Sequence, residues 1–407
     1  MGIDISQKFK AADLPLYVGN FLFFIFILVV MADPTNSIIH KKDIAFVLVV
    51  AYNMAVFKPD WSKLPYIMLL VFAITVPWLT TTIAMGAMDP EEALAAFKSI
   101  SPVVLLLWVR NYNLVGLARG PVVVCCIVMT SLYVAMLVEP MIESVVWTFT
   151  EENDSTIMMA RRSILGVEIF ACYLKSCVSF LFVVAYYMLG LMDKTRRGVL
   201  NWIAMAFIIF TFMVSGTRST MLAPFFMFVV IAFRVFRHSK RLKYIMLPVA
   251  FIVGIAFVVV VVAAIMETDE ASNVVKYGHL SSYATLFDEN PLYLIFGQGP
   301  GTSFYSEGFN EMVFKTEWSY LEIIRCYGLF SLLIVYVYWR PLLTFWRLRE
   351  SDAFTYSMFW TYLAYLLIAG TNPLLISSTG MIMMLMAYSY EDKIKRQYAC
   401  NIKTPTK

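Results

Sequence analysis

Residues 16–32 read LYVGNFLFFIFILVVMA, an apolar run without a charged side chain. A membrane-spanning α-helix needs about 20 predominantly apolar residues, so this run is close to the length of one span. The rest of the chain is similar, since 60% of its 407 residues are hydrophobic and only 15% are charged. Soluble domains are about half apolar and a quarter charged, so the excess allows about twelve spans. This composition excludes a nucleic-acid-binding module, a secreted disulfide scaffold and a disordered chain.

The apolar runs predict an all-α, polytopic membrane helix bundle that forms a single domain over residues 1–407. Twelve candidate spans lie at roughly 16–32, 43–57, 65–85, 95–109, 120–138, 167–192, 198–214, 219–235, 244–266, 318–340, 354–370 and 373–390.

Lysine and arginine set the orientation of such a chain, because cytoplasmic loops carry an excess of them. Basic residues gather near 194–197, 234–243, 347–349 and 393–396, which all fall on one side of the predicted bundle. Both termini are therefore predicted to be cytoplasmic.

Two long acidic segments, 139–166 and 267–317, fall on the opposite side and are predicted to be enlarged outer loops. Lys41 and Lys42 do not fit this sorting, because they form a basic pair on the outer side.

Three arginines also lie on the outer side. Arg218 occupies a short turn, Val214-Ser-Gly-Thr-Arg-Ser-Thr220, between two apolar runs. It either contacts lipid head groups or clamps an anion, since its guanidinium suits phosphate oxygens and a helix begins beside it. Arg161 and Arg162 either neutralise the acidic residues of their own segment or bind phosphate beside Arg218. The three together would match the charge of a pyrophosphate.

Two charged pairs interrupt apolar runs. Glu168 and Lys175 share one face of a predicted helix, and Glu322 and Arg325 are i,i+3 neighbours in the predicted span 318–340. Mutual compensation inside the bundle explains both pairs. Substrate contact is the alternative, with Arg325 as a further candidate for phosphate binding.

A glycine-rich segment, Phe296-Gly-Gln-Gly-Pro-Gly-Thr-Ser303, lies in the second outer region. Glycine permits backbone geometries that other residues rarely adopt, so Gly299 and Gly301 would allow amide groups to face an anion. The alternative is a re-entry turn at the membrane surface. No lysine follows the glycines, as a P-loop would require.

Glu317 precedes Trp318-Ser-Tyr-Leu at the outer end of a predicted span. It is either a solvated helix cap or a carboxylate in a partly desolvated mouth. In the second case its pKa would be raised and it would act as a general base.

This combination resembles the O-antigen polymerase and ligase superfamily, the membrane glycosyltransferases that assemble bacterial surface polysaccharides. The spans and the two outer segments match its layout along nearly the whole chain. Ser215-Gly-Thr-Arg218-Ser looks like its serine–arginine motif, and Gly297-Gln-Gly299-Pro-Gly301 looks like its glycine-rich element. The ligases carry a histidine followed eleven positions later by a glycine, whereas this chain has Glu317 and Gly328 there, with Tyr320 between them. The loss of the histidine favours the polymerases.

The resemblance implies a GT-C-like fold and a multi-pass enzyme of the bacterial inner membrane. The enzyme would polymerise undecaprenyl-pyrophosphate-linked repeat units into O-antigen or capsule, with its active site facing the periplasm. Its partners would be these lipid-linked donors and acceptors, membrane lipids and a chain-length regulator. An O-antigen ligase and a lipid-linked-sugar flippase or transporter are the alternatives.

The resemblance also implies roles for individual residues. Arg218, with Arg161 or Arg162, would stabilise the leaving pyrophosphate, and Glu317 would deprotonate the acceptor hydroxyl for an inverting attack. Pyrophosphate is a good leaving group, so neither a metal ion nor another cofactor is expected. The remaining residues expected to bind substrate are Arg325, Gly299, Gly301 and Tyr320.

Overall fold

The computed structural model describes residues 13–39, 41–85, 89–152, 156–164, 167–192, 198–236 and 271–403, with the single residues 244, 248 and 252. The predicted span 244–266 therefore lies outside the described residues, apart from three positions.

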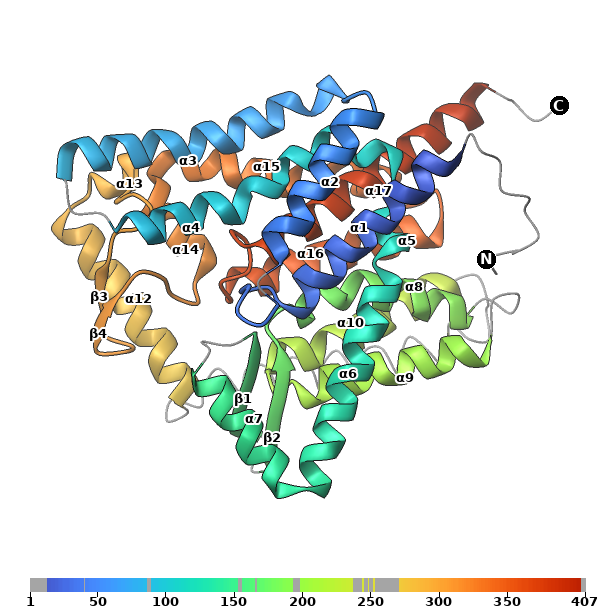
Figure 1. The fold of residues 1–407 in the computed structure, drawn as a ribbon, viewed down its shortest axis with the longest axis horizontal. Helices are drawn as coiled ribbons and strands as arrows, with labels where there is room; N and C mark the ends of the chain where they lie inside the picture. Colours follow the sequence, from blue (N-terminus) through green and yellow to red (C-terminus); the bar gives the residue numbers. More distant parts are fainter. Residues whose placement is uncertain are drawn as a thin grey trace.

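The chain is mostly helical, as predicted (Figure 1). The helices are α1 (Leu14–Ala32), α2 (Lys42–Val56), α3 (Leu64–Met85), α4 (Pro90–Ile100), α5 (Leu114–Leu117), α6 (Arg119–Val138), α7 (Pro140–Glu152), α8 (Leu181–Met192), α9 (Val199–Val214), α10 (Arg218–Phe236), α12 (Ala271–Glu289), α13 (Tyr293–Phe296), α14 (Ser319–Tyr327), α15 (Ser331–Leu348), α16 (Ala353–Gly370) and α17 (Ser378–Lys403). Short 3-10 turns link several of them, the longest being Ser101–Leu107 after α4.

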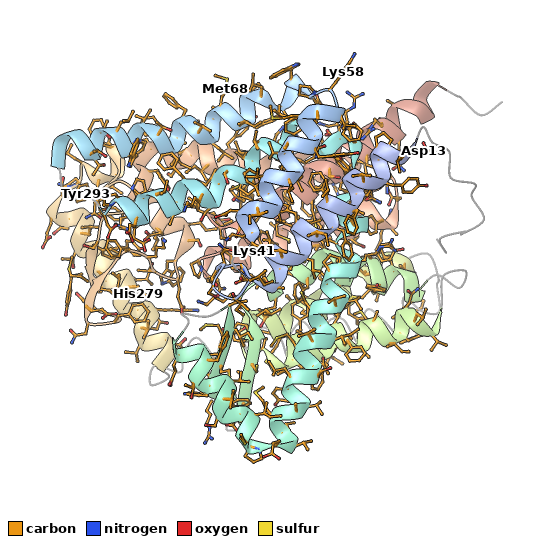
Figure 2. The ribbon with its side chains drawn as sticks, viewed as in Figure 1. Asp13, Lys41, Lys58, Met68, His279 and Tyr293 are labelled. Atoms are coloured by element: carbon orange, nitrogen blue, oxygen red, sulfur yellow. The ribbon has the colours of Figure 1, made fainter. Side chains whose placement is uncertain are left out.

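Four helical stretches in the described part of the chain are long and apolar enough to cross a membrane: Leu14–Ala32, Trp61–Thr82, Leu114–Val138 and Ser319–Leu348. Three shorter apolar helices cover Cys177–Leu191, Val199–Val214 and Ser219–Val235. Large apolar side chains such as Met68 of α3 are exposed on the outside of the bundle (Figure 2). Apolar residues on the outer surface are expected where a helix faces lipid. These helices are consistent with a membrane protein.

The core is centred on α17. Residues 381–391 of this helix are all buried, and they pack against buried aromatic side chains of α15 and α16. Two of the buried tyrosine hydroxyls have carbonyl acceptors: Tyr388 donates to the carbonyl oxygen of Val337 (2.9 Å) and Tyr362 to that of Tyr338 (2.8 Å). These bonds avoid the cost of burying an unpaired polar group.

The two segments predicted as outer loops are largely folded. The segment 139–166 contains α7 and strand β1 (Ile157–Ile164). The segment 267–317 contains α12, α13 and the two short antiparallel strands β3 (Phe304–Ser306) and β4 (Glu311–Val313).

The predicted span 167–192 is wrong in its first third. Residues Val167–Leu174 form strand β2, which pairs with β1 in an antiparallel register from Ile157 opposite Leu174 to Ile164 opposite Val167. Glu168 lies in this strand and Lys175 in the turn after it, so they do not share a helical face. A short apolar run does not by itself distinguish a strand from a helix, and its branched and aromatic residues favour the strand.

The ends of several helices are tied together by ion pairs at one end of the bundle. Arg234 near the end of α10 lies 3.3 Å from Glu350, which follows α15. Lys63, just before α3, lies 2.6 Å from Asp392 in α17. The elements α12, α13, β3 and β4 lie at the opposite end, away from the termini (Figure 1).

Candidate functional site

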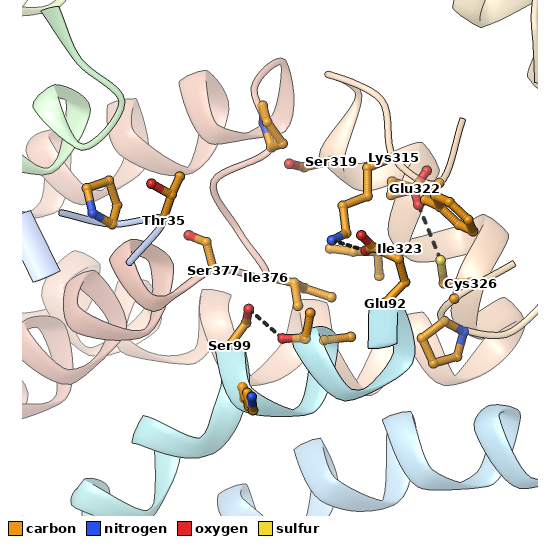
Figure 3. A pocket seen from close by; sticks show the side chains of 18 of the residues that line it. Thr35, Glu92, Ser99, Lys315, Ser319, Glu322, Ile323, Cys326, Ile376 and Ser377 are labelled. Atoms are coloured by element: carbon orange, nitrogen blue, oxygen red, sulfur yellow. Dashed lines mark hydrogen bonds and ion pairs between the residues drawn. The ribbon is translucent and has the colours of Figure 1, made fainter. Parts of the chain in front are cut away.

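A cavity of about 460 Å³ opens between α2, α4, α14 and the turn that precedes α17 (Figure 3). Its lining comes from segments that are far apart in the sequence, including 34–36, 42–43, 92–99, 314–327 and 373–377. The charged side chains that line it are Lys42, Asp43, Glu92, Lys98, Lys315 and Glu322. A concave site with several convergent polar groups is the best candidate for a substrate site in the described part of the chain.

An ion pair between Glu322, which lines the cavity, and the buried Arg325 supports the end of the cavity nearest α14. Arg325 is fully buried, and its guanidinium binds both carboxylate oxygens of Glu322, at 2.5 Å and 3.1 Å. Glu322 also accepts a hydrogen bond from the Tyr283 hydroxyl (2.7 Å), and the Arg325 guanidinium stacks 4.7 Å from the centre of the Phe304 ring. The predicted pairing of Glu322 with Arg325 is confirmed.

Arg325 also holds the glycine-rich segment. It donates to Gln298 Oε1 (2.6 Å), to the Thr302 carbonyl oxygen (3.0 Å) and to that of Phe314 (2.8 Å). An arginine has five N–H donors, and these bonds with those to Glu322 occupy all of them. The prediction that Arg325 binds phosphate is therefore corrected: in this conformation it has no donor left for a ligand, and it positions the cavity wall.

The glycine-rich segment caps the end of α14. The amide of Gln298 donates to the Arg325 carbonyl (2.6 Å), and that of Gly299 donates to the Cys326 carbonyl (3.0 Å). Gly299 and Gly301 have φ angles of 89° and 84°, which side-chain-bearing residues rarely adopt. The amides at 298 and 299 therefore satisfy helix carbonyls, and the expectation that the amide of Gly299 faces an anion is wrong. Gly301 lines the cavity, and its carbonyl accepts a bond from the Asp89 amide (2.9 Å).

Glu317 and Tyr320 do not line the cavity. The Glu317 side chain is 41% exposed and lies 3.5 Å from Lys276 of α12, so its carboxylate is not in a desolvated mouth. The Tyr320 hydroxyl donates to the Leu366 carbonyl of α16 (3.1 Å) and accepts from Trp339 (3.1 Å). Cavity-facing positions of α14 recur at helical spacing, so Tyr320 falls on another face. Neither residue therefore lies at this cavity, whose lining from α14 consists of Ser319, Glu322, Ile323, Cys326 and Tyr327.

The predicted arginine cluster is not assembled at the cavity by the part of the chain that is described. Arg161 lies on β1 with its side chain 77% exposed, 3.7 Å from Glu143 of α7, so it neutralises its own acidic segment. The side chains of Arg162 and Arg218 lie outside the described residues. The backbone of Arg218 begins α10, directly after a turn in which Gly216 has a φ angle of 59°.

Lysines rather than arginines bring positive charge to the cavity. The Lys42 ammonium donates to the Pro34 carbonyl (2.8 Å) and to Ser378 Oγ (3.2 Å), and forms no ion pair with any described carboxylate. Lys98 is exposed at the cavity and likewise has no ion-pair partner among the residues described. Lys315 is paired with Glu92 at 2.7 Å. The sequence did contain a signal for this site, because Lys42 belongs to the basic pair that broke the sorting of charges.

Asp33 organises the loop that supplies a partner for Lys42. Its carboxylate is fully buried and accepts bonds from the amides of residues 37–39, at 2.6 to 3.0 Å, and from the Thr156 hydroxyl at 2.6 Å. Burial alone would raise the pKa of Asp33, but these hydrogen bonds outweigh it and leave the pKa below its usual value. The charged carboxylate therefore fixes the turn after α1, and with it the position of the Pro34 carbonyl.

A comparison with protein-family models gives no match for this chain, and a comparison with curated proteins gives none either.

Proposed function

We propose that this chain is a membrane glycosyltransferase that polymerises undecaprenyl-pyrophosphate-linked repeat units into a surface polysaccharide. The observation that carries the proposal is the cavity, in which Lys42 and Lys98 form no ion pair with a described carboxylate and which Glu92 also lines. Cations in a cavity that form no ion pair favour an anionic ligand, and a diphosphate is the anion that the resemblance supplies.

The proposed topology has about twelve spans of a GT-C-like bundle, with both termini in the cytoplasm of a bacterial cell and the cavity facing the periplasm. Two observations support it. The basic segments around Arg234 and Glu350 meet through an ion pair at one end of the bundle. Helix α2 separates Lys58 from the end that bears Lys41 and the cavity (Figure 2).

The proposed reaction needs an activated acceptor and a stabilised leaving group. The oxygen of an acceptor sugar hydroxyl attacks the anomeric carbon of the donor, while the bond from that carbon to the diphosphate breaks and its electron pair leaves with the diphosphate. Lys42 and Lys98 stabilise the leaving charge, and a cavity carboxylate takes the hydroxyl proton. Glu322 is held by the buried Arg325 and by Tyr283, so we assign this role to Glu92, in place of Glu317. Glu92 is paired only with Lys315, whose side chain is 55% exposed.

The test uses purified protein in liposomes, given only lipid-linked repeat units isolated from the producing bacterium after deletion of this gene. We expect a ladder of longer lipid-linked glycans. Transfer to lipid A core without a ladder identifies a ligase, and transbilayer movement without elongation identifies a flippase. Glu92→Gln is expected to abolish the ladder, whereas Glu317→Gln should leave it intact.

A further inference from the structure

Helix α7 presents an apolar face to the outside of the molecule. Met141 and Val145 are 72% and 58% exposed, and Phe149 continues the same line one turn further on. The exposed residues between them, Ser144 and Thr148, are uncharged. Spacing of three and four residues places all five on one side of the helix.

The opposite side of α7 is apolar as well. Ile142 and Val146 pack against the hydrophobic core, and the one acidic residue in the middle of the helix, Glu143, is paired with Arg161 of β1. A helix that is apolar on both sides is expected to be enclosed on both sides. One side of α7 is covered by the protein, and the other requires an apolar surrounding.

The position of α7 indicates what that surrounding is. Only Glu139 separates α7 from α6, whose stretch Leu114–Val138 is long and apolar enough to cross a membrane. The last exposed residues of α6, Leu137 and Val138, are 65% and 77% exposed, so the apolar surface continues from one helix to the next. Figure 1 shows α7 folding back from the end of α6.

We propose that α7 is an interfacial helix that lies along the outer leaflet, with Met141 and Val145 inserted at the boundary between phospholipid head groups and acyl chains. Helices with an exposed apolar face bind in this plane. The inserted face carries no charge, so the insertion needs no anionic lipid. This inference rests on the membrane location and is independent of the glycosyltransferase activity.

The test places a nitroxide on Met141→Cys and, separately, on Val145→Cys, in the full chain reconstituted in nanodiscs of zwitterionic phospholipid. Glu311→Cys on the exposed strand β4 is the matched position in water, and the unsubstituted chain gives the background from its own cysteines. We expect labels at 141 and 145 to collide with oxygen and to be shielded from a water-soluble nickel chelate, and the label at 311 to show the reverse.

Two outcomes would overturn the proposal. Labels at 141 and 145 that meet the nickel chelate as readily as the label at 311 place the face in water. Labels that are immobilised and shielded from both reagents place it against protein, such as a second copy of the chain. The two positions give independent readings, so a folding defect in one variant leaves the other to decide.

Discussion

The two ends of the cavity differ in how their charges are satisfied. At the α14 end, Arg325 is buried and every donor of its guanidinium has an acceptor within the protein. At the α2 end, the Lys42 ammonium donates hydrogen bonds to neutral oxygens, and neither Lys42 nor Lys98 has an ion pair with the described residues. A charge whose ion pair and hydrogen bonds are complete holds the protein together, whereas a cavity charge without an ion pair is available to a ligand. We therefore assign a structural role to the α14 end of the cavity and ligand binding to the α2 end.

The largest effect is expected from breaking the scaffold. Arg325→Ala leaves the Glu322 carboxylate without its partner and frees the glycine-rich segment, and removal of one member of a buried pair costs about 3–5 kcal/mol. We expect a large loss of thermal stability in detergent, or no folded protein at all. Arg347→Ala, at an exposed arginine of α15, is the control. Equal stability of the two variants would show that Arg325 does not stabilise the fold.

The second largest effect is expected from a change in the backbone conformation of the glycine-rich segment at the α14 end of the cavity. Gly299→Ala forces a side chain into a φ angle of 89° and against Thr81, and strain of this kind costs about 1–3 kcal/mol. Gly198→Ala is the matched control, because its φ is −126° and no atom of the described residues lies within 4 Å of the added carbon. Chemical unfolding should separate the two variants; a Gly299→Ala protein as stable as Gly198→Ala would show that the wall tolerates repacking.

The role of the α2 end of the cavity is tested by measuring ligand binding, not the stability of the protein. Lys42→Ala is expected to weaken the binding of undecaprenyl pyrophosphate in nanodiscs about tenfold, which corresponds to about 1.4 kcal/mol, because one charge-assisted contact is lost. Lys41→Ala changes the neighbouring residue, which does not line the cavity, and should bind normally. If both substitutions weaken binding equally, general surface charge accounts for the affinity and Lys42 is not a specific ligand.

A smaller effect concerns pH. His279 of α12 is buried, bonded through Nδ1 to Ser306 Oγ (2.8 Å), and its Nε2 has no partner among the described residues. Burial lowers the pKa of His279, although Glu317 and Glu322 oppose the shift. Between this lowered value and about 6.5 the unfolded chain binds more protons, so stability falls as the pH decreases through that window. We expect His279→Gln to flatten this part of the pH–stability curve, and an unchanged slope would contradict the assignment.

The smallest effect is expected at the outer hairpin. The Arg161–Glu143 pair is exposed, and exposed pairs contribute about 0–1 kcal/mol. The free energy of unfolding of Arg161→Ala should therefore lie within about 0.5 kcal/mol of the wild-type value. This variant should also elongate glycans at the wild-type rate. A large loss of elongation would indicate that Arg161 binds substrate. The proposed difference between Arg161 and Lys42 would then not hold.

The membrane class and most helices follow from the sequence because long apolar runs have few other structures available. The run 16–32 lies within α1, and the Glu322–Arg325 pair was evident from its i,i+3 spacing. The strand β2 was missed because its apolar residues alone fit a helix equally well. The cavity depends on contacts between distant segments, such as Lys42 with Ser378, and no local pattern contains that information.

The most direct test of the account compares glycan elongation by three purified proteins: the wild type, Lys42→Ala/Lys98→Ala and Lys41→Ala. We predict a full ladder of lipid-linked glycans from the wild type and from Lys41→Ala, and at least about a tenfold lower rate from the double variant, since two contacts to the leaving diphosphate are lost. A ladder from the double variant that matches the wild type, or no ladder from the wild type itself, would contradict the assignment of this cavity as the site of polymerisation.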